Sequence, residues 1–89
     1  MEKYTVKIPK NIGKITRDMP KNAVETLSFL IDDIRDLGPI QPAYHNYSKL
    51  GESTYHCHLA YHWVACWRCE DGEFIVEVEY VGSREKAPY

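Results

Sequence analysis

The hydrophobic pattern of the chain changes period along its length, from alternation to helical spacing and back. At the start, apolar and polar residues alternate over residues 4–8, which predicts a first strand. Over residues 9–19 the apolar positions recur every three or four residues, which predicts a short helix that Pro9 begins. Pro20 ends or kinks this helix, because proline has no backbone N–H to donate.

A second, longer helix has the clearest periodicity. An apolar stripe with helical spacing covers residues 24–37, and a Gly-Pro pair directly after it ends the helix. Asn22 with Glu25 three positions later is similar to a capping box, so we expect the helix to begin there. A polar loop follows over residues 39–46, and a short strand is expected over residues 47–50.

The last third of the chain returns to alternation. Three β-prone runs cover residues 55–61, 63–69 and 74–81, and Glu70–Glu73 forms a hairpin turn between the last two. In the third run apolar residues alternate with glutamates, so one face is buried and the other faces water. The order β-α-α-β-β-β predicts one α+β domain over residues 1–89. Its N-terminal strand and helical hairpin pack on one face of a small, twisted, mainly antiparallel sheet.

Charge is distributed unevenly, although the formal net charge is only −2. Residues 1–24 hold six basic and two acidic residues, so their formal net charge is +4. Residues 25–89 hold five basic and eleven acidic residues, so their formal net charge is −6. We therefore expect any contact with a polyanion at the N-terminal segment and at Arg84 and Lys86.

Other features favour a cytoplasmic protein. The chain has no apolar run of membrane-spanning length, so no membrane contact is expected. Its first residues are polar and charged, unlike a secretory signal peptide. Three cysteines are an odd number, which favours a reducing compartment over a disulfide framework.

Two histidines provide the first candidate chemistry. His56 and His58 are two positions apart on a predicted strand, so they point to the same face of the sheet. Because their neighbours are mostly apolar, we expect both imidazoles on the face that the helices leave exposed. Imidazoles titrate near pH 7 and suit acid–base work or anion binding, although a surface histidine is more often idle.

Three further side chains extend the candidate site. Arg84 follows the last strand, where its guanidinium offers a fork of donors to a phosphate, or an ion pair to Glu85. Tyr89 ends the sequence and is either a docked plug or a site residue. Trp63 follows the turn that contains His62, and its ring either stacks on a base or packs in the core.

A metal site is the main alternative. Cys66 and Cys69 have a C-x-x-C spacing, with Cys57 and the histidines nearby. A structural zinc site usually holds such a pair in a tight turn, whereas residues three apart on a strand point to opposite faces. We therefore interpret Cys57 and Cys66 as buried, inert thiols and expect no metal or other cofactor.

The motifs of residues 47–89 resemble those of the RelE/ParE superfamily of bacterial toxins. The nearest branches are the RelE and YafQ-like mRNA interferases of type II toxin–antitoxin systems. The run C-H-L-A-Y-H-W over residues 57–63 is similar to the YafQ-like run C-H-I-x-x-D-W. V-G-S-R over residues 81–84 is similar to the RelE ending V-G-x-R, and K-L-G over residues 49–51 to the family's leucine-glycine turn. The order of the elements is also that of the family.

The resemblance implies a function and a set of residues. It implies an endoribonuclease that cleaves mRNA in the ribosomal A site without a cofactor and leaves 2′,3′-cyclic phosphate and 5′-OH ends. It also implies a cognate antitoxin as a partner, beside mRNA and the ribosome. The residues that it assigns to catalysis are His58, Arg84, Tyr89 and His56, and those that it assigns to substrate binding are Trp63, His62, Lys86, Lys10, Lys14 and Arg17.

Departures from the family pattern support a second hypothesis. His62 replaces an aspartate, Val64 lies where RelE has an additional arginine, and the chain is mildly acidic. Weaker positive charge means weaker binding to ribosomal RNA. The alternative is a toxin-fold protein without nuclease activity, either a ParE-like gyrase inhibitor or an inactive toxin that still binds an antitoxin.

Overall fold

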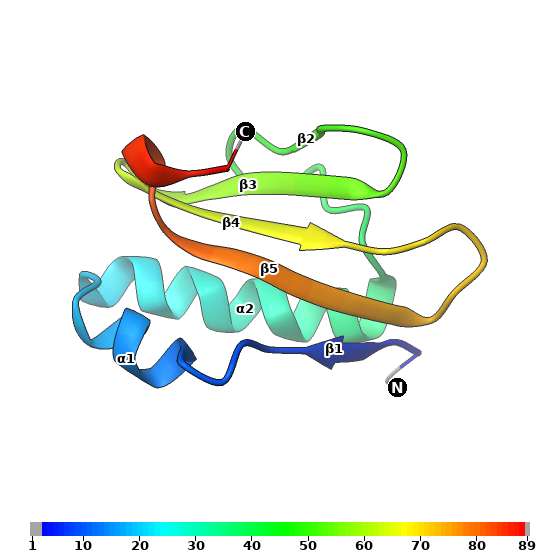
Figure 1. Ribbon diagram of the computed structural model, residues 1–89, viewed down its shortest axis with the longest axis horizontal. Coiled ribbons are helices and arrows are strands. Elements are labelled where there is room, and N and C mark those ends of the chain that lie inside the picture. The colour runs from blue at the N-terminus through cyan, green and yellow to red at the C-terminus, as the bar shows by residue number, and fades with distance from the viewer. Residues whose placement is uncertain (1–2, 89) are drawn as a thin grey trace.

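The computed structural model describes residues 3–88, which form a sheet with α-helices on one face (Figure 1). The predicted α+β class and element order are confirmed, with a two-residue strand before the last three strands. The helices are α1 (Ile12–Arg17), α2 (Lys21–Leu37) and the 3-10 helix η1 (Arg84–Lys86). The strands are β1 (Thr5–Lys7), β2 (Ser48–Lys49), β3 (Thr54–Ala60), β4 (Trp63–Arg68) and β5 (Ile75–Ser83).

The five strands described lie in the order β1-β5-β4-β3-β2. From β5 to β2 every neighbouring pair is antiparallel, as predicted. The first strand instead runs parallel to the last one, and Val6 pairs with Val76. The first and last strands therefore lie side by side, and the helices connect β1 to the far edge of the sheet (Figure 1).

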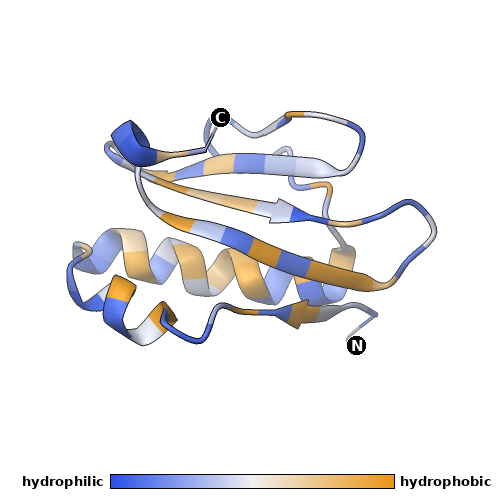
Figure 2. Cartoon of the chain, viewed as in Figure 1, coloured by the Kyte–Doolittle hydropathy of each residue, from blue (hydrophilic) through white to orange (hydrophobic). Residues whose placement is uncertain are grey.

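The core lies between α2 and the sheet. The buried stripe of α2 faces strand residues that alternate with polar ones, and Figure 2 shows this alternation along β5. Trp67 is fully buried at the centre, where its indole N–H donates a hydrogen bond of 3.0 Å to the carbonyl oxygen of Pro39. Its ring stacks on Tyr55, with ring centroids 6.2 Å apart. The α2 residues buried against this centre are Ala23, Leu27, Leu30 and Ile34.

Two predictions about the helices were wrong. The first helix covers only Ile12–Arg17. Before it, Pro9 belongs to a turn in which the backbone N–H of Ile12 donates to the carbonyl oxygen of Pro9. After it, the backbone N–H of Asp18 donates to the carbonyl oxygen of Ile15 in another tight turn, so the helix does not continue. The second begins at Lys21, directly after Pro20, whose carbonyl oxygen accepts hydrogen bonds from the first turn of α2. Asn22 and Glu25, the residues of the expected capping box, therefore both lie inside the helix.

Gly38 ends α2 at a point where only glycine fits. Its φ of 92° lies in the left-handed region, and a Cβ there would lie 2.6 Å from the ring of Tyr4. The backbone N–H groups of Lys3 and Tyr4 donate to the carbonyl oxygen of Arg35. This close approach fixes the start of the chain against the end of α2.

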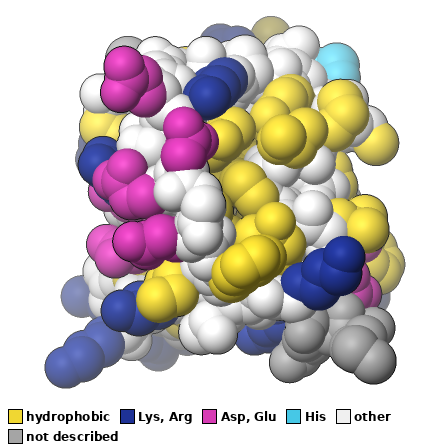
Figure 3. Space-filling model, turned by 90° about the vertical axis from the view of Figure 1, so that its right-hand side faces the viewer, with side chains coloured by type: hydrophobic (Ala, Val, Ile, Leu, Met, Phe, Trp, Pro, Cys, Tyr) yellow, Lys and Arg dark blue, Asp and Glu magenta, His cyan; other side chains and the backbone are white. Residues whose placement is uncertain are grey.

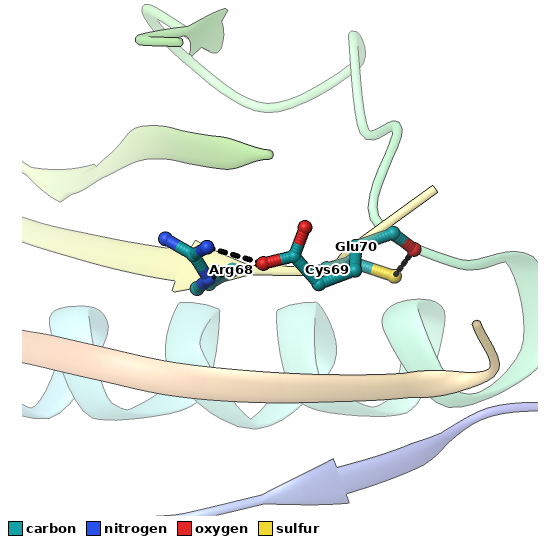
Figure 4. Close-up of polar contacts among 3 residues, drawn as sticks. All are labelled: Arg68, Cys69 and Glu70. Atoms are coloured by element: carbon teal, nitrogen blue, oxygen red, sulfur yellow. Dashed lines mark hydrogen bonds and ion pairs between the residues drawn. The ribbon is translucent and has the colours of Figure 1, made fainter. Parts of the chain in front are cut away.

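The turn between β4 and β5 is held by a cysteine and an ion pair (Figure 4). The thiol of Cys69 points toward the carbonyl oxygens of Glu70 and Glu73, with Sγ–O distances of 3.8 and 3.6 Å. Arg68 pairs with the carboxylate of Glu70, and Gly72 takes a positive φ of 81°. These contacts fix the backbone of the turn and the carboxylate of Glu70.

Candidate functional site

Three imidazoles gather on the sheet face opposite α2. His58 is at the centre, with ring centroids 5.9 Å from His56 and 6.1 Å from His45. The loop before β2 brings in His45, because the backbone N–H of His58 donates a 2.8 Å hydrogen bond to the carbonyl oxygen of His45. In the same loop Asn46 takes a φ of 53°, and its Nδ2 lies 3.3 Å from Nδ1 of His58. Sequence reasoning missed His45, since only the fold brings this loop to β3.

Both histidines lie on the sheet face opposite α2, as expected, but His58 is only partly exposed and His56 is buried. His56 is only 8% exposed, and its Nδ1 lies 3.0 Å from the hydroxyl oxygen of Ser48 on β2. Its pairing neighbour on the other side, Cys66, is also buried. Residues beyond β5 cover this part of the face, and Pro88 lines a depression of about 340 Å³ together with Cys66. His56 is therefore part of a small second core.

The chain after β5 turns back across the histidine side of the sheet (Figure 1). The backbone N–H of Arg84 donates a 2.6 Å hydrogen bond to the carbonyl oxygen of His62. Glu85 places a carboxylate oxygen 3.6 Å from Nδ1 of His62, and the guanidinium carbon of Arg84 lies 5.7 Å from the ring centroid of Tyr61. The β3–β4 turn and η1 are thus joined, and Arg84 is held at one end of the histidine cluster.

The electrostatics of the cluster favour a neutral imidazole at its centre. The pKa of His58 lies below its ordinary value, mainly because burial disfavours the charged form and next because His56, His45 and Arg84 add positive charge. Burial also lowers the pKa of His56. A neutral imidazole beside a guanidinium can accept a proton, while the guanidinium binds an anion.

Aromatic residues near the cluster divide between the two faces of the sheet. Trp63, a predicted base-stacking residue, packs against the core cluster on the helix-covered side. Tyr61 is 77% exposed instead, and its ring centroid lies 4.3 Å from that of His62. The only signal for Tyr61 in the sequence is its central position in a tight turn, which leaves the side chain in solvent.

The remaining predicted residues are scattered. Lys86 is exposed on η1, close in sequence to Arg84. Lys14 and Arg17 are exposed on α1, and Lys10 precedes it, at the β1 edge of the sheet and away from β3 (Figure 1). Tyr89 lies outside the described residues. The structure therefore brings His56, His58, His62 and Arg84 to one side of the sheet, and separates them from the basic residues of the first helix.

The three cysteines are divided between the two faces of the sheet. Cys57 and Cys69 belong to the core beneath α2, whereas Cys66 lies on the opposite face. Burial raises the pKa of the Cys57 thiol to about 12 and that of Cys66 to about 11. Among residues 3–88, no group of three His, Cys, Asp or Glu side chains is arranged to hold a metal ion.

Within the same residues, no helix has the length and apolarity needed to span a bilayer.

Solved structures with a similar fold are known for this small α+β domain. No protein-family model and no curated protein matches the sequence. A chain of the archaeal RelE–RelB complex from Pyrococcus horikoshii aligns over 96% of this chain and 99% of its own, with a TM-score of 0.71 and 15% identity. A chain of the Escherichia coli DinJ–YafQ toxin–antitoxin complex aligns over 98% and 99%, with a TM-score of 0.71 and 12% identity.

A third structure agrees with these two. The YoeB dimer of Staphylococcus aureus aligns over 92% of this chain and 98% of its own, with a TM-score of 0.69 and 11% identity. The chain therefore has the RelE-like toxin fold, as the sequence resemblance implied. Because a fold carries many functions, the activity has to be argued from the residues of this chain.

Proposed function

We propose that this protein is the toxin of a type II toxin–antitoxin system, a ribosome-dependent endoribonuclease that cleaves mRNA in the cytoplasm. The observation that carries the proposal is the position of His58, between two other imidazoles and within the electrostatic reach of Arg84. The RelE-like fold supports it, since two similar structures were solved as toxin–antitoxin complexes. A cognate antitoxin is the proposed protein partner.

The chemistry requires one base, one cation and one acid. The ribose 2′-OH attacks the neighbouring phosphorus, and neutral His58 accepts the proton of the hydroxyl. The guanidinium of Arg84 stabilises the negative charge of the phosphorane through its fork of N–H donors. The bond to the 5′ oxygen then breaks, and an acid protonates that oxygen, a role that we assign to Tyr89 or to a protonated histidine. The products are a 2′,3′-cyclic phosphate and a 5′-OH end.

Other residues position the RNA in this proposal. His56 holds the edge of the site through Ser48, and Lys86 lies on η1 beside the phosphate-binding Arg84. Tyr61 replaces Trp63 as the proposed stacking surface, because its ring is exposed and adjacent to Arg84. Lys10, Lys14 and Arg17 remain proposed contacts with ribosomal RNA, on a separate part of the surface.

The test is to map new 5′-OH ends on mRNA after induction of the protein in a bacterial host. We expect in-frame cuts and growth arrest with the wild type, and a loss of both in His58→Ala and in Arg84→Ala. Arg35→Ala is the matched control, because Arg35 lies on α2 and pairs with Asp32 on the other side of the sheet. Absence of new 5′-OH ends while ribosomes are translating, or cleavage at the wild-type level by both variants, would contradict the proposal.

A second candidate is favoured by the acidic side of the open face. Glu77 and Glu79 are exposed on β5 and alternate with the core residues Val76 and Val78. Carboxylates on this face repel the phosphates of RNA and weaken docking to the ribosome. The same fold would then act by protein binding alone, either on gyrase or on an antitoxin.

The two candidates differ in a direct assay. A gyrase inhibitor reduces ATP-dependent supercoiling of a relaxed plasmid by purified gyrase and produces no 5′-OH ends on mRNA. A protein that only binds an antitoxin changes neither readout. If gyrase supercoils the plasmid at its uninhibited rate in the presence of excess toxin-fold protein, the hypothesis of a gyrase inhibitor is excluded.

A further inference from the structure

One end of the molecule carries a hydrophobic surface that the fold leaves uncovered. The C-terminal end of α2, the segment after it and the start of β5 contribute large apolar side chains there. Leu37 is 71% exposed, Ile40 65% and Phe74 61%. Figure 3 views this end and shows hydrophobic side chains gathered beside a group of acidic ones. An exposed cluster of large apolar residues is typical of a surface that a partner covers.

Local packing gives this surface a fixed shape. The ring of Phe74 packs against Tyr4 with centroids 5.3 Å apart, and Tyr4 in turn lies against Gly38. Between α2 and the β4–β5 turn is a depression of about 170 Å³. The residues that line it are Tyr4, Leu37, Pro39, Ile40, Tyr55, Cys69, Glu70, Asp71, Gly72 and Glu73.

The border of the depression is acidic. The β4–β5 turn supplies three carboxylates, those of Glu70, Asp71 and Glu73. The thiol of Cys69 contacts the carbonyl oxygen of Glu70 within this turn (Figure 4). Arg68 neutralises only Glu70. Among residues 3–88, Asp71 and Glu73 form no ion pair with Lys, Arg or His, and no Lys or Arg lines the depression. An apolar floor thus meets two carboxylates that form no ion pair within the described part of the chain, and Lys7 and Arg68 line a neighbouring depression together with Glu73.

We propose that this surface, which we call the acidic-bordered patch (Leu37, Ile40, Asp71, Glu73 and Phe74), binds a protein segment that carries an apolar side chain flanked by lysine or arginine. The apolar side chain fills the depression, which removes nonpolar area from water. The flanking cations meet Asp71 and Glu73, and this complementarity selects the partner and speeds association.

The charge of the patch argues against other occupants. A nucleic acid would place phosphates against Asp71 and Glu73. A symmetric contact with a second copy of the chain would bring like carboxylates close together, which costs free energy. Under the proposed function, on which this step rests, the partner is the antitoxin, and the segment that contacts this end is basic.

The experiment selects peptides from a phage-displayed random library on immobilised wild-type protein. We expect the enriched peptides to contain a large apolar residue next to two or more lysines or arginines. Fluorescence anisotropy should show at least about tenfold weaker binding to Ile40→Ser and to Asp71→Lys. Binding to the wild type should also weaken as NaCl is raised, because salt screens exposed charges.

Matched controls separate the patch from general stickiness and from unfolding. Phe29→Ser removes an aromatic ring that is 63% exposed elsewhere on α2, and Glu25→Lys reverses an exposed charge at the other end of that helix. Both should bind the selected peptides like the wild type. All four substitutions are at exposed positions, so circular dichroism and thermal unfolding should show folded protein in each case.

Several outcomes overturn the inference. They are no enriched peptide, enrichment of acidic or neutral sequences, equal binding to Ile40→Ser and wild type, and an Ile40-dependent dimer in sedimentation. None of these depends on nuclease activity, which the 5′-OH mapping measures separately. Peptide binding without mRNA cleavage would remove the nuclease assignment while the binding surface remained established.

Discussion

The hydroxyl oxygen of Ser48 lies 3.0 Å from Nδ1 of His56, and this contact joins the short edge strand β2 to a buried imidazole. Burial makes the charged form of His56 unfavourable in the folded protein, whereas the unfolded chain exposes the ring to water. A hydrogen bond to the backbone of Ser48 acts in the opposite direction and is the smaller of the two effects. The burial of His56 therefore makes the stability of the domain depend on pH.

We expect the free energy of unfolding to decrease as the pH is lowered from about 7.5 to 5. Because the folded state lowers the pKa of His56, the unfolded chain binds more protons in this range, and acid favours unfolding. His58 contributes in the same direction. Urea titrations at a series of pH values measure the slope. His56→Gln should flatten it, and identical slopes in His56→Gln and the wild type would contradict the assignment.

Cleavage should require a guanidinium, and not only a positive charge, at position 84. Arg84→Lys keeps the charge but loses the fork of donors, so we expect about a tenfold to hundredfold slower cleavage of mRNA. The rate of appearance of 5′-OH ends in a reconstituted translation reaction provides the measurement. Arg35→Lys, on the helix side of the sheet, should cleave at the wild-type rate. Equal rates for Arg84→Lys and wild type would leave Arg84 with a purely electrostatic role.

Two glycine-to-alanine substitutions should change stability in opposite directions. Gly38→Ala places a methyl group against the ring of Tyr4 at a residue with positive φ, so we expect a loss of about 1–3 kcal/mol. Gly13→Ala, in α1, meets no atom within 4 Å and should stabilise the protein by about 0.5–1 kcal/mol. Thermal unfolding of the two variants beside the wild type tests the pair. An unchanged melting temperature for Gly38→Ala would mean that Tyr4 moves aside at little cost.

The buried thiols should resist alkylation in the folded protein. Burial raises the pKa of Cys57 to about 12 and that of Cys66 to about 11, so very little of either is thiolate at pH 8. Cys69 is buried as well, and its pKa is also raised. We expect slow labelling by iodoacetamide in buffer and fast labelling of all three cysteines in concentrated guanidinium chloride, followed by mass spectrometry. Fast labelling of Cys66 alone would indicate that the segment after β5 opens.

Local patterns predicted the last three strands well, because each has a core face and a water face. The runs over residues 55–61, 63–69 and 74–81 differ from the observed strands by at most two residues at either end. Helix α1 was predicted too long. Apolar residues with helical spacing continue beyond its ends into the turns next to Pro9 and Pro20, and the spacing alone does not separate a turn from a helix. Nothing local indicates that β1 runs parallel to β5, because that pairing joins distant segments.

The candidate site was predicted in part for the same reason. The two-residue spacing of His56 and His58 placed both on one face, which the pairing of β3 with β4 confirms. The spacing says nothing about what lies above that face, so the burial of His56 was not foreseen. His45 and Tyr61 were missed because their positions depend on a loop and a turn, and Trp63 was left open between a core and a site role until its packing was known.

The parallel pairing of β1 with β5 has a consequence for how the domain folds. The antiparallel strands β2 to β5 follow one another closely in sequence and can form through short-range contacts. The pairing of Val6 with Val76 closes a loop that contains nearly all of the chain, and its entropic cost places it late in folding. Until then the edge of β5 is open to strands of other molecules. We therefore expect misfolding at high concentration to proceed by strand exchange at this edge.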